Sequence, residues 1–548
     1  MVFSWRTAST SILVLFVAIF TFTFPIKVTE VKQAVISHIL SLEALQAPLN
    51  AAFAPVVDLG YAKYQGTIDP LTQNWNFLGI RYAAEPTGAL RFNAPAPPPS
   101  VSGTQKANAY PVRCFQGGIG MSPVNPVSKN AGGFKYQNSE FIHADDESED
   151  CLFLNVHTPN YIPMGALYGG PIQGFYDGNS LITHSGNGVI VVTVQYRLGV
   201  FGFLAGDEVK RQQFAFQWVQ EHISKFGGDP TKVTIWGQSA GAGSVLQHLI
   251  ANGGQTNPPL FRAAIINSVF LPSQYVYNDP IPKAIYTEVV SQANCSSSSD
   301  TLECLRNAEV TVLATAHKSI GRATFFGTFI PVPVVDGTFI TQSPLKALKA
   351  GKLNTNNLLA FSTTDEGSFF VHRDIVNALS HTSEYPRRKA AGAHYKSFGD
   401  NVATARKIMG DALFDCPTYY ILQNFVGAAY KASWWCFILF AISPGFHGND
   451  IAYLFPKFTG AGVPLYNNAE FIKALTTSFT NFVITLDPND NASTLAPFWH
   501  RWNSESELSE ISFNATESGA PLVQRVVTDP GLLERCRFWE SVTGETFQ

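Results

Sequence analysis

Charged residues are scarce in this chain, and neither sign predominates. Only 14% of the 548 residues are Asp, Glu, Lys or Arg, and 37 basic residues against 41 acidic ones give a net charge of −4. No basic block is long enough to neutralise a row of phosphates, so we expect no nucleic-acid partner. Hydrophobic residues make up 45% of the chain, which excludes a disordered acidic chain or a coiled coil and favours a globular protein.

The sequence also lacks the motifs that commonly hold cofactors. It has no Walker-type phosphate loop, no Gly-x-Gly-x-x-Gly turn, no Cys-x-x-Cys pair and no His-Glu-x-x-His helix. No repeat with a period of 20 to 50 residues is present either. We therefore expect neither a metal nor a nucleotide cofactor.

A hydrophobic run long enough to span a bilayer is missing. The N-terminal region places Arg6 ahead of an apolar run from Ile12 to Phe24, which is too short for a comfortable span and is typical of a secretory signal. The small-x-small cleavage motif Ala52-Phe53-Ala54 lies far beyond that run, so a buried helix or an uncleaved anchor at residues 12–24 remain alternatives. We predict a targeting segment over residues 1–54 and a secreted protein, with membrane contact only if the segment is an uncleaved anchor.

The cysteines and glycosylation sequons agree with an oxidising compartment. Seven cysteines are an odd number, so at least one thiol has no partner within the chain. Cys436 is the candidate because it lies in the apolar stretch 434–440, which differs from its surroundings. Three Asn-x-Ser/Thr sequons are candidate glycosylation sites: Asn294, Asn491 and Asn514.

The middle of the chain alternates short β-branched runs with amphipathic stretches. This pattern is typical of βαβ units and of a mainly parallel sheet. We expect strands at residues 189–194, 233–236, 261–266 and 358–362, and a helix at 214–226.

Directly after the strand expected at 233–236 comes the sequence Gly237-Gln238-Ser239-Ala240-Gly241. A Gly-x-Ser-x-Gly match is weak by itself, but a strand before it and a helix after it indicate a nucleophile elbow. The strained turn raises the Ser239 hydroxyl above the sheet, and small flanking residues let the backbone pass. Ser239 is therefore the predicted nucleophile.

A serine nucleophile needs a base and an orienting carboxylate, in the chain order Ser, acid, His. His447 lies between glycines in a loop, whereas His500 stands in an aromatic setting that suggests packing; the other C-terminal histidines are His372, His381 and His394. Glu366 follows the strand expected at 358–362, where a sheet edge would present it. From the pattern alone, a solvated loop carboxylate is the better explanation of Glu366.

Further motifs lie along the chain in a characteristic order. They are FLGIRYA at 77–83, LRF at 90–92, SEDCL at 148–152, QYRLG at 195–199 and FGGDP at 226–230. Together with the elbow, they resemble the type-B carboxylesterase and cholinesterase family, particularly its secreted fungal esterases and lipases. The resemblance runs from about residue 55 to residue 548.

The resemblance implies one α/β-hydrolase domain over residues 55–548, with a mostly parallel central sheet and helices on both faces. It favours Glu366 as the acid, His447 as the base and the Ala240 amide as an oxyanion donor. It also implies a buried structural ion pair between Arg91 and Glu149. Three disulfides are implied as well: Cys114 with Cys151, Cys295 with Cys304, and Cys416 with Cys536.

Several departures from the family pattern accompany these matches. Where the family has a further strand ending in a glycine-rich oxyanion loop, this chain has only residues 161–171, so either Gly169 and Gly170 are the remaining donors or strand and loop are both missing. A stretch after Val209 is shortened, and Gln238 replaces the usual acidic residue. With the apolar stretch 434–440, these departures are the pattern expected of misassigned exon boundaries, and a genuinely diverged protein is the alternative.

We therefore predict a carboxylic ester hydrolase that acts through Ser239, His447 and Glu366 on a small-molecule or lipid ester. The alternative from another class is a non-catalytic or impaired binding protein of the same fold, because the oxyanion loop is short.

Overall fold

The computed structural model describes residues 54–126, 133–136, 146–160, 164–169, 176–204, 209–372, 393–435, 445–457, 466–490, 493–503, 508–546 and 548. The chain divides into two compact units, Met1–Pro55 and Val56–Gln548, and all the elements below belong to the second. The predicted targeting segment and the alternative anchor at 12–24 lie outside the described residues. No helix within the described ranges is long and apolar enough to cross a lipid bilayer.

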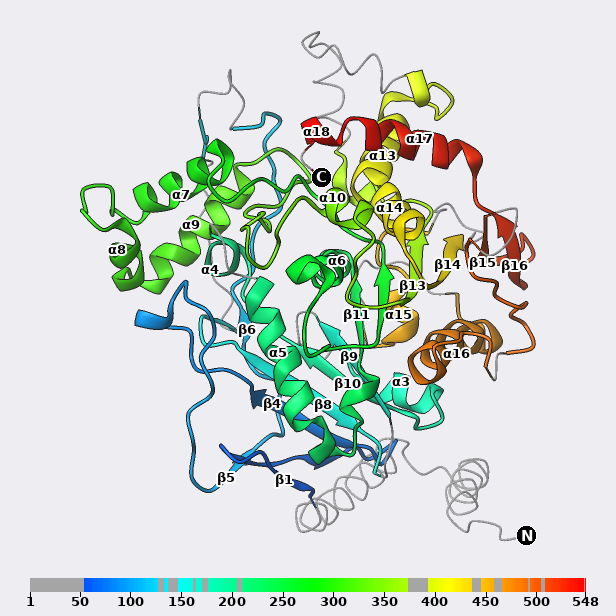
Figure 1. The fold of residues 1–548 in the computed structure, drawn as a ribbon, viewed down its shortest axis with the longest axis horizontal. Helices are drawn as coiled ribbons and strands as arrows, with labels where there is room; N and C mark the ends of the chain where they lie inside the picture. Colours follow the sequence, from blue (N-terminus) through cyan, green and yellow to red (C-terminus); the bar gives the residue numbers. More distant parts are fainter. Residues whose placement is uncertain are drawn as a thin grey trace, which may run out of the picture. The chain divides into compact units, whose positions relative to one another are not determined.

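An eleven-stranded sheet runs through the described part of the second unit (Figure 1). Its strands, in spatial order, are β16 (Pro521–Val527), β15 (Ser509–Ala515), β14 (Ala428–Trp435), β13 (Asn357–Thr363), β12 (Ala263–Asn267), β11 (Thr234–Gln238), β9 (Met164–Gly169), β10 (Val189–Val194), β8 (Phe153–Thr158), β4 (Trp75–Arg81) and β3 (Thr67–Ile68). The strands from β9 to β15 are mutually parallel, and the antiparallel pairs lie at the two edges. The predicted, mostly parallel sheet is confirmed.

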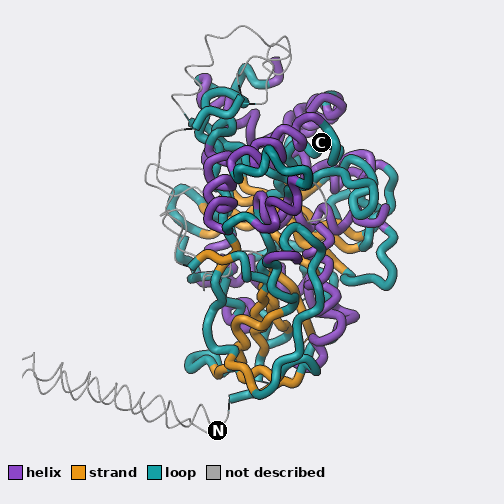
Figure 2. Tube along the Cα trace, turned by 90° about the vertical axis from the view of Figure 1, so that its left-hand side faces the viewer, coloured by secondary structure: helices purple, strands orange, loops and turns teal. Residues whose placement is uncertain are grey.

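Helices cover both faces of this sheet, because successive side chains of its buried strands point to opposite sides. In β10, Ile190 and Val192 belong to one apolar cluster, and Val189 and Val191 belong to the other. The first cluster includes residues of α5 (Val209–His222), α6 (Ala240–Ile250), α10 (Pro344–Lys349) and α14 (Cys416–Asn424). The second includes residues of α3 (Asn179–His184), α15 (Ile451–Leu454) and α16 (Ala469–Thr485). Figure 2 shows the strands between these helical layers, which is the layering predicted for an α/β-hydrolase.

Shorter elements complete the unit. A third apolar cluster joins α4 (Gly199–Phe203), α7 (Pro280–Gln292), α8 (Thr301–Asn307) and α9 (Val310–Arg322). Two small sheets contain β1 (Val56–Asp58), β2 (Lys63–Gln65) and β5 (Thr104–Lys106), and β6 (Arg113–Cys114) with β7 (Glu147–Ser148). The remaining helical elements are η1 (Gly88–Leu90), η2 (Ile223–Phe226), η3 (Pro230–Lys232), η4 (Ala251–Gly254), η5 (Ser368–Phe370), α13 (Asn401–Gly410), the π-helical turn η6 (Asp411–Asp415), α17 (Pro530–Ser541) and α18 (Thr543–Thr546).

The suspected loss of a central strand is wrong. Residues 164–169 form β9, which pairs in parallel with β10 on one side and with β11 on the other. Strand β9 therefore supplies the backbone hydrogen bonds that its neighbours would otherwise lack. The shortened stretch after Val209 lies in the first turn of α5.

The start of the apolar stretch 434–440 belongs to the core. Trp434 lies near the end of β14 and is only 1% exposed, and its ring packs against Tyr453 and Phe471. Trp434 is therefore a core residue, as an apolar strand end requires, and the proposed insertion of most of the stretch stays a prediction. Cys436 and the rest of the stretch lie outside the described residues.

Three disulfides join the six remaining cysteines in the pairs that the resemblance implies: Cys114 to Cys151, Cys295 to Cys304, and Cys416 to Cys536. The ion pair between Arg91 and Glu149 is present too, with nitrogen–oxygen distances of 2.6 and 2.8 Å between buried side chains. Arg91 also donates to the carbonyl oxygens of residues 305, 306 and 308. It therefore ties the chain after η1 to the end of α8, which is a structural role.

Candidate active site

The turn between β11 and α6 places Ser239 above the carboxyl edge of the sheet. Ser239 has φ 57° and ψ −121°, a strained conformation of the kind found at functional turns. A Cβ atom at Gly237 would lie 2.2 Å from the carbonyl of Gly241, and one at Gly243 would lie 2.3 Å from the carbonyl oxygen of Phe270. Glycine is therefore required at both positions for the strand, turn and helix to pack this closely.

The two other predicted triad residues meet Ser239 at this turn. The Nε2 atom of His447 lies 2.7 Å from the Ser239 Oγ, and its Nδ1 atom lies 2.5 Å from Glu366 Oε2. Glu366 comes from the loop after β13, and His447 from the loop between β14 and α15. The amide of Asp365 donates to the carbonyl oxygen of Gly445 at 3.1 Å, so the two loops are joined directly.

The other C-terminal histidines lie elsewhere. His500 packs against Phe498, His372 against Phe326 and His394 against Phe538. His381 lies outside the described residues. The expected packing role of His500 therefore agrees with its aromatic neighbour.

Glu366 is held as a buried carboxylate. It is 1% exposed, and Oε1 accepts hydrogen bonds of 2.7 Å from the Ser268 hydroxyl and from the backbone amide of Thr363. Burial favours the neutral acid, but the charge of His447 and the hydrogen bonds from His447, Ser268 and Thr363 outweigh it, and the pKa of Glu366 lies below its usual value. The view of Glu366 as a solvated loop carboxylate is wrong.

A second buried carboxylate, which the sequence analysis missed, lies behind the histidine loop. Asp450 is 0% exposed, and its Oδ2 accepts a 2.5 Å hydrogen bond from the side-chain amide of Asn267, whose Oδ1 accepts from the Trp236 indole at 2.9 Å. Burial raises the pKa of Asp450 to about 6. The chain Trp236, Asn267, Asp450 thus connects β11, β12 and the loop that carries His447.

The residue beside the nucleophile also reaches the base. The side-chain nitrogen of Gln238 lies 3.3 Å from His447 Nε2. An acidic residue here would face the same imidazole with a negative charge. The Gln238 amide and the Ser239 hydroxyl instead both approach the Nε2 atom of His447, so they compete for its lone pair.

Aromatic side chains support the other side of the imidazole. The ring centroids of Phe414 and Phe370 lie 4.5 and 5.2 Å from that of His447. Phe414 belongs to η6 and Phe370 to η5. These rings limit the movement of the base and shield it from water.

The predicted oxyanion donors lie near the same strand ends. Ala240 is the first residue of α6, so its amide is one of the four at a helix N-terminus without an intrahelical partner. Gly169 is the last residue of β9, between β10 and β11. Gly170 lies outside the described residues.

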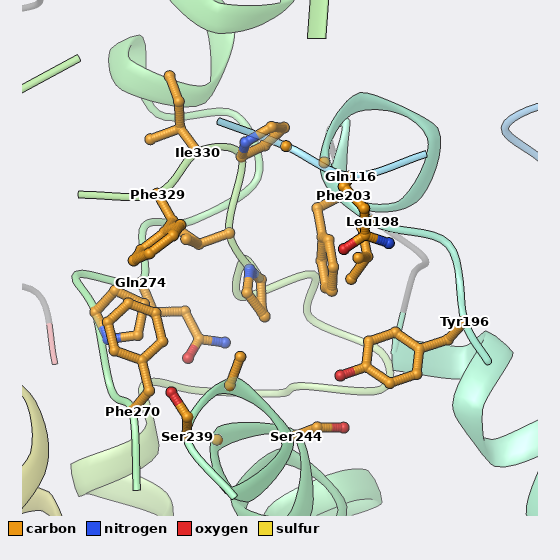
Figure 3. Close-up of a pocket in the computed structure, with 18 of the residues that line it drawn as sticks. Gln116, Tyr196, Leu198, Phe203, Ser239, Ser244, Phe270, Gln274, Phe329 and Ile330 are labelled. Carbon is orange, nitrogen blue, oxygen red and sulfur yellow. The ribbon is translucent and has the colours of Figure 1, made fainter. Parts of the chain in front are cut away.

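A cavity of about 340 Å³ opens above Ser239. Figure 3 shows Ser239 at its floor, with Phe270 and Phe329 on one side and Phe203 with Leu198 on the other. Such a wall accepts an apolar group beside the nucleophile. Within the described residues, no group of three or more His, Cys, Asp or Glu side chains is arranged to hold a metal ion.

Comparisons with known proteins identify the family of this chain. The sequence model of the carboxylesterase family matches residues 54–539. The chain is similar to secreted lipase 1 of Botryotinia fuckeliana (strain B05.10), with 29% identity over 79% of this chain and 85% of that protein. Lipase 4 of Diutina rugosa is 31% identical over 79% of this chain and 87% of its own length.

A solved structure gives the same result. The crystal structure of Aspergillus niger EstA is similar with a TM-score of 0.73 and 27% sequence identity, covering 90% of this chain and 99% of that one. The chain therefore belongs to the carboxylesterase family, and it is a carboxylic ester hydrolase with the α/β-hydrolase fold.

Proposed function

We propose that this enzyme cleaves its ester through a covalent acyl-enzyme on Ser239. His447 takes the hydroxyl proton as Ser239 attacks the ester carbonyl, and Glu366 holds the imidazole and stabilises its charged form. Collapse of the tetrahedral intermediate transfers that proton to the leaving alcohol, and water then releases the acid by the reverse sequence. The observation that carries this proposal is the continuous hydrogen-bonded chain from Ser239 through His447 to Glu366, at 2.7 and 2.5 Å.

Charge that develops on the carbonyl oxygen needs fixed donors. The Ala240 amide is favoured by its position at the start of α6, and the Gly169 amide by its position at the end of β9. Gly170 is the alternative donor from the same loop. Loss of even one such donor typically lowers kcat by about 10²–10³-fold.

The apolar cavity favours substrates with an apolar group next to the ester, either small molecules or lipids. Relatives named secreted lipase 1 and secreted triacylglycerol lipase LIP1 support this class and support secretion. Three disulfides fit an oxidising compartment as well. We accordingly assign targeting to residues 1–54 and catalysis to residues 55–548.

The rival proposal, a non-catalytic binding protein, has less support. A binding protein has no need of a strained serine, a base within hydrogen-bond reach and a buried carboxylate whose pKa is held low. The short oxyanion loop is the single feature that favours it.

A fluorophosphonate probe separates the two proposals. Wild-type protein should be labelled, Ser239→Ala should not, and peptide mapping should place the adduct on Ser239 and not on Ser244, which lines the same cavity. Labelling that survives Ser239→Ala would refute the assignment of the nucleophile. A short p-nitrophenyl ester, turned over by wild type only, tests the activity itself.

A further inference from the structure

One tyrosine hydroxyl at the active-site cavity makes no hydrogen bond to any described residue. Tyr196 lines the cavity with Ser239 and Ala240, and Figure 3 shows its hydroxyl pointing inward. Other largely buried tyrosines use their hydroxyls within the fold: Tyr61 donates to the Arg81 carbonyl at 2.6 Å and Tyr82 to the Gln195 carbonyl at 2.8 Å. Tyr196 is half-buried, so its hydroxyl is open to a ligand in the cavity.

Strand register places Tyr196 level with the nucleophile. Thr193 of β10, Tyr168 of β9 and Trp236 of β11 form one row across the sheet. Tyr196 and Ser239 each come three residues after that row, Tyr196 two residues past the end of β10 and Ser239 one residue past the end of β11. Strands β10 and β11 lie two strand spacings apart, about 9.5 Å between backbones, and a phenol side chain directed inward spans most of that distance.

The sequence after the strand between them contains a residue that cannot donate. β9 stops at Gly169, and the second residue after it is Pro171, which has no amide hydrogen to donate. The negative oxygen of a tetrahedral intermediate on Ser239 needs more than the Ala240 amide. A phenol hydroxyl at this level of the sheet can fill that need.

The protonation state of Tyr196 suits a donor. Burial raises the pKa of Tyr196 to about 12. The phenol therefore keeps its proton, and its ability to donate, across the pH range in which ester hydrolysis is assayed.

We propose that the Tyr196 hydroxyl is an oxyanion donor in this enzyme, hydrogen-bonding the carbonyl oxygen of the substrate ester as that oxygen becomes negative on Ser239. This inference rests on the proposed acyl-enzyme mechanism. Tyr196 transfers no proton; its O–H bond stays intact while it stabilises the charge beside the Ala240 amide.

The test compares Tyr196→Phe with wild type on a short p-nitrophenyl ester. We expect kcat to fall by about 10²–10³-fold with KM changed by less than about threefold, because the hydroxyl acts on the transition state. Affinity for an alkyl trifluoromethyl ketone, whose adduct on Ser239 carries the same oxyanion, should fall by a similar factor. The matched control is Tyr286→Phe, which removes a hydroxyl bonded to Thr301 at 2.8 Å between α7 and α8 and should leave both quantities unchanged.

Unchanged kcat and ketone affinity in Tyr196→Phe would overturn the inference and leave the acyl-enzyme mechanism standing. A loss confined to KM or to thermal stability would also overturn it, since it would indicate a structural role. Absence of turnover and of ketone binding in wild type would instead overturn the mechanism, and the inference with it. If Tyr196→Phe does not fold, a 3-fluorotyrosine at position 196, nearly the same shape but a stronger donor, should bind the ketone more tightly than wild type; equal or weaker binding contradicts the proposal.

Discussion

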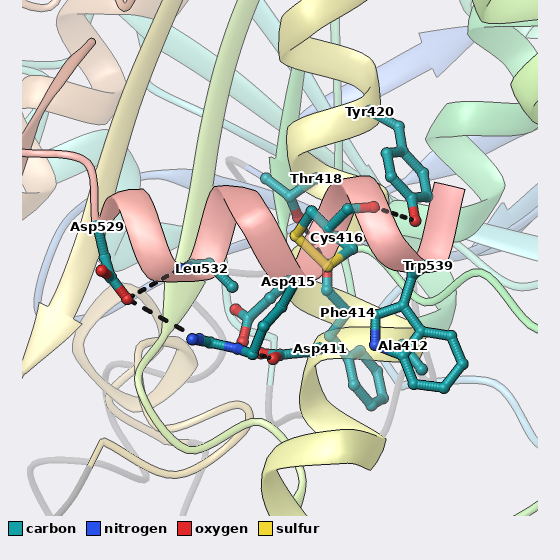
Figure 4. The surroundings of a disulfide bond; sticks show 12 residues. Asp411, Ala412, Phe414, Asp415, Cys416, Thr418, Tyr420, Asp529, Leu532 and Trp539 are labelled. Carbon is teal, nitrogen blue, oxygen red and sulfur yellow. Dashed lines mark hydrogen bonds and ion pairs between the residues drawn. A yellow bond between two sulfur atoms is a disulfide. The ribbon is translucent and has the colours of Figure 1, made fainter. Parts of the chain in front are cut away.

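Removal of the Cys416–Cys536 disulfide should destabilise this protein more than removal of the Cys295–Cys304 disulfide. The first connects the start of α14 to α17 (Figure 4), and both of its cysteines are at most 1% exposed. The second closes a short loop between α7 and α8. The two pairs therefore differ chiefly in the length of chain that each one restrains.

The magnitude follows from that length. In the chain-entropy description, a separation of 120 residues corresponds to about 5 kcal/mol of lost unfolded-state freedom, and one of 9 residues to about 2.6 kcal/mol. The double variant Cys416→Ala/Cys536→Ala should thus lose roughly twice as much free energy of unfolding as Cys295→Ala/Cys304→Ala.

The region around the Cys416–Cys536 disulfide also supports the catalytic base, His447. Phe414, which packs on His447, precedes Cys416 by two residues within η6, and Arg535 beside Cys536 donates to Asp411 of the same turn at 2.6 Å. Ester hydrolysis should accordingly be lost at a lower urea concentration in the Cys416/Cys536 variant than in wild type. Urea unfolding followed by tryptophan fluorescence, with activity in parallel, measures both effects. Equal losses of unfolding free energy in the two double variants would refute the reasoning.

Three further predictions concern single side chains. The pKa of Asp450 is raised from 3.8 to about 6, so its contribution to stability is fully present below pH 3.8 and is lost as the pH rises through 6. Between pH 4 and 7, the unfolding free energy of wild type in urea should therefore fall by about 2.4 kcal/mol more than that of Asp450→Asn; parallel pH profiles would contradict this. Glu366→Gln should lower kcat by about 10⁴-fold with little change in KM, since the amide no longer stabilises charged His447; a loss below tenfold would exclude Glu366 as the acid. Asn294 is exposed, whereas Asn514 is half-buried in β15 and accepts a hydrogen bond from a backbone amide at 2.8 Å, so we expect a glycan on Asn294 and none on Asn514. Enzymatic deglycosylation should therefore shift the mass of Asn514→Gln as much as that of wild type. The shift of Asn294→Gln should be smaller by the mass of one glycan.

The sequence predicted the elements that carry strong local signals. The β-branched run 189–194 coincides with β10, and the elbow around Ser239 stands between β11 and α6. Strand β9 escaped prediction because its sequence, MGALYG, has no β-branched residue and contains two glycines. Strand β9 forms because it pairs with β10 on one side and β11 on the other. A local sequence pattern contains no information about such pairing.

The supporting residues of the site were missed for a related reason. Asn267 and Asp450 are 183 positions apart, and Ser268 and Glu366 are 98 apart, so nothing in the sequence links the partners of either pair. The burial of Glu366 shows its role. The sequence after a strand looks the same whether its carboxylate is solvated or buried, so the sequence could not show this. The carboxyl-edge position of residues 267 and 268 was the one signal that could have drawn attention to them.

The most direct test of the mechanism is the capture of the acyl-enzyme itself. Rapid mixing of wild type with a p-nitrophenyl ester, followed by acid quench and intact-mass measurement, should give a burst of p-nitrophenolate and a matching acyl adduct that peptide mapping places on Ser239. Ser239→Ala should show neither. An adduct on another residue, or turnover that persists in Ser239→Ala, would contradict the account.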